Sequence, residues 1–268
     1  MKISRALFFI LALGGAAAMH APAQADTKAA TPSLTAKQIM TKVVESDPWG
    51  FGGAEVNAKA VVTEKTGKSR ELVFDGKSRR YAPPLAKSVI TFQAPADVAG
   101  MKFLQIQNAN GDDDRFLYTP ELKRSRRIAG ANRSDAFMGT DFSYADLDGR
   151  DLRQSTSVLM AEETLGKFEC YHLAATPTNG DAVYTKIELW VRKDNFVPLK
   201  WIMFDKKAQP VKTLLTKEIQ RHGGHWFITS SRMNDNTTGR STELKLEKID
   251  VRDDIPLDNF SVRAIEKG

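Results

Sequence analysis

The sequence is poor in the residue types on which most redox and metal sites depend. Its 268 residues include one cysteine, Cys170, and four histidines. A single cysteine excludes an intramolecular disulfide, so packing must stabilise the fold. Because Cys170 lies in an alternating, strand-like segment, we expect it to be a buried apolar residue and not a nucleophile.

Motifs of several catalytic and nucleotide-binding classes are also missing. There is no Gly-x-Ser-x-Gly nucleophile elbow and no glycine-rich phosphate loop. Residues 112–114 are three aspartates without the alternating ligands of a calcium loop, and His222 and His225 have no third ligand at a recognisable spacing. We expect no metal, no cofactor and no catalytic residues, although a Ser-His-acid triad built from distant residues stays open.

Only one long apolar run occurs, and it lies at the N-terminus. Residues 6–19 are uncharged, follow Lys2 and Arg5, and precede the small-residue sequence Ala23-Gln24-Ala25. This order is that of a secretory signal peptide, and the run is too short for a permanent membrane-spanning helix. We therefore expect residues 1–25 to be cleaved during export to the periplasm.

The rest of the chain is long enough for one large β domain. Residues 26–33 are polar and rich in alanine and threonine, and we expect them to be disordered. No repeat or linker divides residues 34–268, which predicts a single domain there. No cysteine that could accept a lipid follows the apolar run. We therefore expect a soluble periplasmic protein without a lipid anchor.

Hydrophobic periodicity changes once along the chain. Residues 35–45 carry an apolar stripe at helical spacing behind a capping-box sequence. From Val56 onward, apolar and polar residues alternate in short segments that turn sequences separate. Strands without intervening helices favour an antiparallel meander, so we predict one mainly β, strongly curved antiparallel sheet with the 35–45 helix against its concave face.

The centre of the chain breaks this alternation. Residues 130–153 follow neither period and predict a long loop with one or two short helical turns. The loop carries bulky apolar side chains, which either pin it to the core or form a soft gate over an apolar cavity. Trp49 and Phe51, beside three glycines, present the same two alternatives. The bulky apolar residues of the loop are Phe137, Met138, Phe142 and Tyr144.

Positive charge is densest just before this loop. The whole chain has a formal net charge of +6. The cluster is either a solvated sheet edge protected against aggregation or a docking surface for anionic headgroups or an acidic partner. Nucleic acid is not expected, because no aromatic residues accompany the cations for base stacking. The cluster consists of Lys123, Arg124, Arg126 and Arg127, with Arg133 nearby.

Several blocks of the sequence resemble the outer-membrane lipoprotein-sorting protein family, relatives of the carriers LolA and LolB. The blocks are residues 115–128 and 137–147, the strand-turn-strand unit 189–200, and the closing residues 255–262. The resemblance implies an unclosed antiparallel β-barrel, short helices that cover its mouth, and an apolar cavity that holds acyl chains. It implies no chemistry of the protein's own.

We therefore predict a carrier and not an enzyme: a periplasmic protein that moves lipoprotein acyl chains or another lipid between membranes. Similar proteins accompany large inner-membrane exporters, so the expected partners are an RND- or MMPL-type transporter and, transiently, an anionic membrane surface. The alternative is a membrane-docking adaptor subunit of an RND-type lipid exporter that binds no cargo. A secreted hydrolase is a third alternative.

Overall fold

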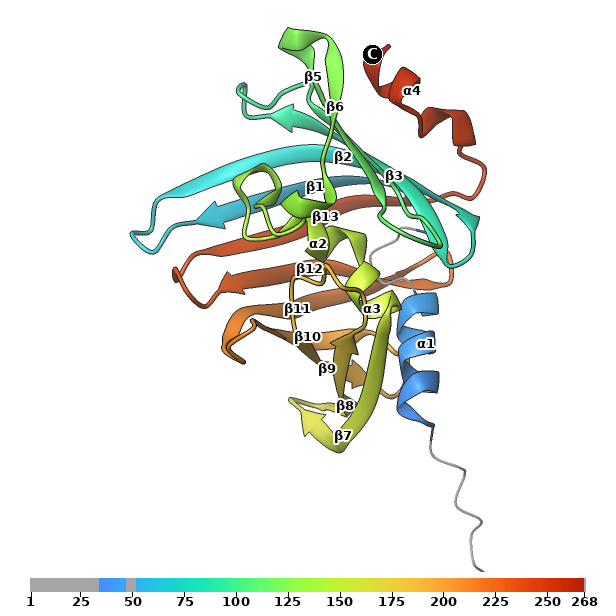
Figure 1. Ribbon diagram of the computed structural model, residues 1–268, viewed down its shortest axis with the longest axis vertical. Coiled ribbons are helices and arrows are strands. Elements are labelled where there is room, and N and C mark those ends of the chain that lie inside the picture. The colour runs from blue at the N-terminus through green and yellow to red at the C-terminus, as the bar shows by residue number, and fades with distance from the viewer. Residues whose placement is uncertain (1–33, 47–51, 268) are drawn as a thin grey trace, which may run out of the picture. The chain divides into compact units, whose positions relative to one another are not determined.

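The computed structural model describes residues 34–46 and 52–267, and its first element is helix α1, Ala36–Ser46. The capping box forms, because the Thr35 amide donates to Gln38 Oε1 at 2.8 Å and the Gln38 amide donates to Thr35 Oγ1 at 3.3 Å. The apolar stripe of the helix is buried and packs with the inner side chains of the sheet. The helix predicted on the concave face is therefore confirmed (Figure 1).

Thirteen strands form one sheet in which every neighbouring pair is antiparallel. The strands are β1 Gly53–Thr63, β2 Ser69–Ala82, β3 Leu85–Ala94, β4 Lys102–Ile106, β5 Asp114–Thr119, β6 Arg124–Arg127, β7 Ser155–Leu165, β8 Phe168–Pro177, β9 Lys186–Arg192, β10 Pro198–Phe204, β11 Pro210–His222, β12 His225–Asp235 and β13 Ser241–Val251.

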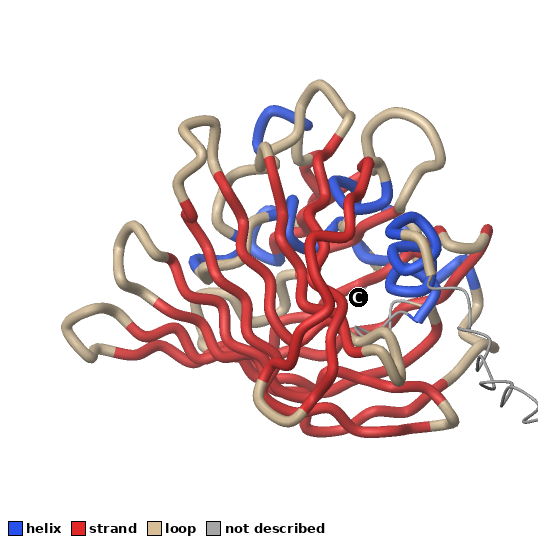
Figure 2. Tube along the Cα trace, turned by 90° about the horizontal axis from the view of Figure 1, so that it is seen from below, coloured by secondary structure: helices blue, strands red, loops and turns tan. Residues whose placement is uncertain are grey.

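The strand order shows two meanders joined in the middle of the sheet. One runs from β1 outward to β6, the other from β7 inward to β13, and β1 pairs with β13 from Ala54–Val251 to Thr63–Ser241. The sheet curls strongly, but its outer strands β6 and β7 do not pair with each other (Figure 2). The predicted fold, a curved antiparallel sheet not closed into a barrel, is confirmed.

The segment between the two outer strands crosses the concave face of the sheet. It starts from β6 at one edge and ends in β7 at the other, so it bridges the open side of the curl. We call residues 130–153 the plug. The plug is more helical than the predicted loop, with the short helices η2 Gly130–Asn132, η3 Phe137–Gly139, α2 Tyr144–Asp148 and α3 Arg150–Arg153.

Local sequence explains where α2 begins and ends. Ser143 is its N-cap: the Asp146 amide donates to Ser143 Oγ at 3.3 Å, and Asp146 Oδ2 accepts from the Ser143 amide at 2.7 Å. Gly149 ends the helix in the left-handed region, with φ of 61°, where glycine carries no steric penalty. The chain then turns directly into α3.

Apolar side chains are buried on both faces of the sheet. Two clusters fill the concave side, and a third lies under the C-terminal arm, which contains η4 Leu257–Asn259 and α4 Val262–Glu266. Cys170 is buried on β8, as predicted, and this burial raises the pKa of its thiol. None of the helices in the described residues is long and apolar enough to cross a membrane.

Candidate functional site

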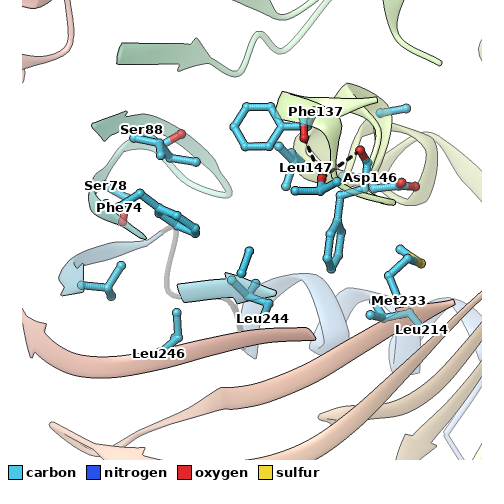
Figure 3. Close-up of a pocket in the computed structure, with 18 of the residues that line it drawn as sticks. Phe74, Ser78, Ser88, Phe137, Asp146, Leu147, Leu214, Met233, Leu244 and Leu246 are labelled. Atoms are coloured by element: carbon cyan, nitrogen blue, oxygen red, sulfur yellow. Dashed lines mark hydrogen bonds between the residues drawn. The ribbon is translucent and has the colours of Figure 1, made fainter. Parts of the chain in front are cut away.

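A cavity of about 150 Å³ lies between the plug and the concave face of the sheet. Its walls are mainly apolar and come from both meanders: Phe74 on β2 faces it from one, and Leu214 and Met233 on β11 and β12 face it from the other (Figure 3). Leu244 on β13 lies between them. Because period-two alternation sends every second side chain to this face, the apolar lining follows directly from the strand pattern.

The plug contributes the remaining wall. Phe137 and Phe142 line the cavity, and both are buried. The Phe137 ring packs against Phe103 and Tyr144, with centroid separations of 5.0 and 5.6 Å. Tyr144 and Met138 belong to the same core cluster but do not line the cavity. Of the predicted gate residues, two therefore face the cavity and two pack behind them.

Trp49 and Phe51, the other two predicted gate residues, lie outside the described residues. Their part in the site stays a prediction.

The aromatic part of the plug is a tight turn that polar contacts attach to the sheet. Met138 and Gly139 both take positive φ, 51° and 78°, and the Phe137 amide donates to the Phe142 carbonyl at 2.7 Å. Arg70 on β2 donates to the Met138 carbonyl at 3.5 Å, and Arg240, before β13, donates to the Gly139 carbonyl at 2.8 Å. These bonds hold the turn by its backbone and leave the phenyl rings directed to the core.

The other end of the plug is fixed by buried ion pairs. Asp148 is completely buried and pairs with Arg115 of β5 and with Arg133, whose Nε lies 3.1 Å from Asp148 Oδ2. Arg133 Nη2 also lies 2.8 Å from Asp151 Oδ1. Burial raises the pKa of Asp148, while the hydrogen bond from Arg133 and the charge of Arg115 oppose that rise. Burial would lower the pKa of Arg133, but Asp148 and Asp151 outweigh it and raise this pKa.

Arg133 was predicted as part of the exposed basic cluster, and the structure corrects this. Its side chain is only 1% exposed and is committed to the plug's own carboxylates. A guanidinium can be buried when planar, bidentate partners surround it, which sequence proximity to other cations does not reveal. Arg133 therefore cannot take part in a docking surface.

The two aspartates before β5, Asp112 and Asp113, also contact the plug. Asp112 pairs with Arg150 of α3 at 2.6 Å, and Asp113 pairs with Arg153 at 3.4 Å. Arg150 also reaches Asp181 in the loop between β8 and β9, at 3.0 Å. From the sequence, residues 112–114 could be judged only as lacking the pattern of a calcium loop; these ion pairs were missed because they depend on the fold of the plug.

Asp146 is a second polar residue that sequence reasoning missed. It lines the cavity from α2, and it accepts from the Tyr184 hydroxyl and from Lys212 Nζ, both at 2.7 Å. Burial, and then the charge of Asp146, raise the pKa of Tyr184 well above its ordinary value, so its hydroxyl remains a donor.

The rest of the predicted basic cluster lies on the outer strand β6 or next to it. Arg124, Arg126 and Arg127 belong to β6, Lys123 directly precedes it, and all four are exposed. Arg127 pairs with Asp114 of β5, and the Ser125 amide of β6 donates to Glu266 of α4 at 2.7 Å. Three of the four cations thus lie on an outer strand of the sheet, and Leu122, which is also exposed, lies beside Lys123.

Together these features define a class: an open, curled antiparallel sheet with an apolar cavity beneath a helical plug. A family model described only as that of an uncharacterized protein matches residues 85–267. This is more than half of the chain, and the chain belongs to that family. A search of curated proteins found no match.

Solved structures share the whole architecture. A putative outer membrane lipoprotein-sorting protein domain from Vibrio parahaemolyticus is 27% identical, with a TM-score of 0.80 over 85% of this chain and 97% of that one. A DUF1329 family protein from Desulfovibrio piger is 26% identical, with a TM-score of 0.79 over 87% of this chain and 100% of that one. The predicted resemblance to lipoprotein-sorting proteins is confirmed.

A more distant structure shows the same fold. A LolA superfamily protein from Nitrosomonas europaea is 19% identical, with a TM-score of 0.69 over 85% of this chain and 98% of that one. At this identity the likeness concerns the fold alone.

Proposed function

We propose that this protein is a periplasmic carrier that holds the acyl chains of a lipidated protein, or of another lipid, in the cavity under the plug. The observation that carries the proposal is the cavity itself, which both meanders line with apolar side chains and which the plug covers with Phe137 and Phe142. The similarity to a structure described as a putative lipoprotein-sorting domain supports it. The role requires no catalytic residue.

Burial of an acyl chain supplies enough energy for such a carrier. At about 0.8 kcal/mol for each buried methylene, a 14-carbon chain gains about 10 kcal/mol on leaving water. A bilayer offers a similar gain, so the carrier and the membrane are nearly balanced. Small differences at a donor or acceptor then decide the direction of transfer.

The cavity must enlarge before it accepts a long chain. A cavity of about 150 Å³ holds a molecule of roughly the size of benzene. The plug is the wall best placed to move, because a small number of hydrogen bonds attach its aromatic turn to the sheet: those to the Met138 and Gly139 carbonyls and those between Asp141 and Thr242. We propose that residues 137–147 gate the cavity, with Phe137 and Phe142 as the moving cover and Trp49 and Phe51 as further candidates.

We also propose the location and partners that such a role needs. Residues 1–25 are proposed to direct export to the periplasm. The four exposed cations at β6, Lys123 to Arg127, suit transient contact with an anionic membrane surface or with acidic residues of an RND- or MMPL-type transporter.

The test is to purify the protein from a membrane-containing lysate, extract it with organic solvent, and identify bound lipid by mass spectrometry. A fluorescent fatty-acyl probe is titrated in parallel. Leu214→Asp places a carboxylate on the cavity wall and is expected to abolish both signals. Thr213→Asp, at the neighbouring position that points to the other face, is the control. Absence of lipid and of probe binding in the folded wild type contradicts the proposal.

A further inference from the structure

One polar atom in the cavity wall has no hydrogen-bond partner among the described residues. Trp201 lies on β10, opposite Leu189 of β9 and Leu214 of β11, and its ring lines the cavity. The same ring borders a second hollow of about 120 Å³, whose lining includes Val43 of α1 and Arg153 of α3. Trp201 therefore stands where the apolar cavity meets a more polar space.

The Trp201 indole Nε1–H is buried and has no acceptor within hydrogen-bond distance among the described residues. Burying a donor without an acceptor costs about 1–3 kcal/mol. The carboxylates that line the two hollows are directed to other donors. Asp146 accepts from Tyr184 and Lys212, and Asp151 accepts from Arg133 at 2.8 Å.

We infer that the cargo carries a neutral hydrogen-bond acceptor, an ester or amide carbonyl, at the head of its apolar chain, and that Trp201 Nε1–H donates to it. This inference rests on the proposed carrier function and names the ligand class. A hydrocarbon would leave the donor unpaired. A free carboxylate would find no excess of positive charge, because Asp146 and Asp148 balance Arg80 and Arg153 in the lining of the second hollow.

The position of Trp201 also orients the cargo. Ser78 and Ser88 lie together at the opposite end of the cavity, beside Phe74 and far from Leu214 and Met233 (Figure 3). β3, which carries Ser88, and β10 are separated by five strands in the sheet. The carbonyl head is therefore placed at β10, near α1 and α3, and the chain extends from there toward β2 and β3.

The experiment compares methyl decanoate with dodecane, which has the same chain length but no acceptor, by displacement of the fluorescent hydrocarbon diphenylhexatriene. Trp201→Phe keeps an aromatic ring and removes the donor. We expect its affinity for methyl decanoate to fall by about 5- to 10-fold relative to its affinity for dodecane, the loss of one hydrogen bond. Decanoic acid at pH 8 is expected to bind wild type less tightly than the methyl ester.

Ser88→Ala is the matched control at the other end of the cavity, and it is expected to leave the ester preference unchanged. Equal losses for ester and alkane in Trp201→Phe overturn the inference, because the indole then acts only by packing. A lost ester preference in Ser88→Ala overturns the orientation. Failure of both ligands and of diphenylhexatriene to bind folded wild type overturns the carrier function itself.

A measurement on the unmodified protein guards against a variant that does not fold. In the ¹⁵N-labelled wild type, methyl decanoate is expected to move the Trp201 indole N–H resonance downfield, as a new hydrogen bond requires. Dodecane is expected to leave the proton shift near its starting value. The same movement with both ligands contradicts a hydrogen bond to the ester.

Discussion

The two ends of the plug cover the same sheet by different means. Residues 137–142 present phenyl rings to the cavity and attach to the sheet through hydrogen bonds to backbone carbonyls and through the buried side chain of Asp141, which accepts from the Thr242 hydroxyl of β13 at 2.6 Å. Residues 148–153 attach through largely buried ion pairs to Arg115 of β5 and to the two aspartates before it, and Arg133 links Asp148 to Asp151 within the plug. Apolar contacts are non-directional and can reform around a guest, whereas buried ion pairs have one geometry.

This difference assigns the two ends different tasks. The charged end fixes where the plug lies, because displacing it would leave buried charges without partners. The aromatic end can separate from the sheet because a guest chain that occupies the same surface offsets the free energy of the lost apolar contacts. The plug is thus a cover with one fixed end and one exchangeable end.

The largest expected effect comes from breaking the fixed end. Asp148→Asn keeps the shape of the side chain but leaves Arg115 and Arg133 without their shared carboxylate. Removing one partner of a buried pair costs about 3–5 kcal/mol. Chemical denaturation measures the free energy of unfolding. Asp97→Asn, which breaks the exposed pair with Arg70, is the control and should change it by less than about 1 kcal/mol.

A smaller effect is expected at the exchangeable end. Phe142→Ala should lower the free energy of unfolding by about 1–3 kcal/mol, less than the roughly 3–5 kcal/mol of a fully enclosed phenylalanine such as Phe103, because one side of Phe142 faces the cavity. The affinity for a fluorescent fatty-acyl probe should fall clearly. Unchanged probe affinity together with a loss of stability as large as that of Phe103→Ala would show that Phe142 is ordinary core.

Acid should loosen the fixed end through Asp181. Burial raises the pKa of Asp181, but the hydrogen bond from Asn179 and the charges of Arg150 and Arg133 outweigh it and lower the pKa below its ordinary 3.8. The resulting stability is complete above the unfolded carboxyl's pKa and is lost as the pH falls through the folded one. Below pH 4, unfolding free energy should therefore fall more steeply in wild type than in Asp181→Asn. Parallel curves for the two proteins would mean that Asp181 does not help to hold the fixed end of the plug.

The smallest effect on stability is expected outside the plug. Reversing Arg124, Arg126 and Arg127 to glutamate should change the free energy of unfolding by no more than about 0.5 kcal/mol for each site, because all three are exposed. Sedimentation with anionic liposomes should show weaker binding. A triple reversal of the exposed Lys65, Lys206 and Lys207 is the charge-matched control. Equal loss of binding in both variants would mean that net charge alone matters.

Much of the fold follows from alternation, and the exceptions have physical causes. Strand β4 buries Phe103, Leu104 and Gln105 in succession, since the C-terminal arm covers the convex face there and removes the polar side of the pattern. Strand β7, which the sequence pattern did not identify, carries apolar residues on both faces: Leu159 packs against the core, whereas Val158 and Met160 are exposed. Apolar residues on both faces of a strand hide the period of two.

The site was predictable only where a side chain was out of place in its own segment. Phe137 and Phe142 stood out as bulky residues in a loop without a period. The role of Asp148 gave no such signal, because its partners Arg115 and Arg133 are brought to it by a strand and a turn that pack together only in the folded chain. Pairing of this kind depends on tertiary structure and not on spacing.

The junction of β1 with β13 has a consequence for how the chain folds. Each meander can form from neighbouring hairpins, but the ladder in the middle of the sheet joins Ala54 to Val251 and so requires nearly the whole polypeptide. Contacts between such distant residues slow folding, because the intervening chain loses entropy before the contacts are made. The two half-sheets are therefore expected to assemble first and to dock last. Until then, the apolar wall that later encloses the cavity remains in contact with water, which makes the final step the one most exposed to aggregation.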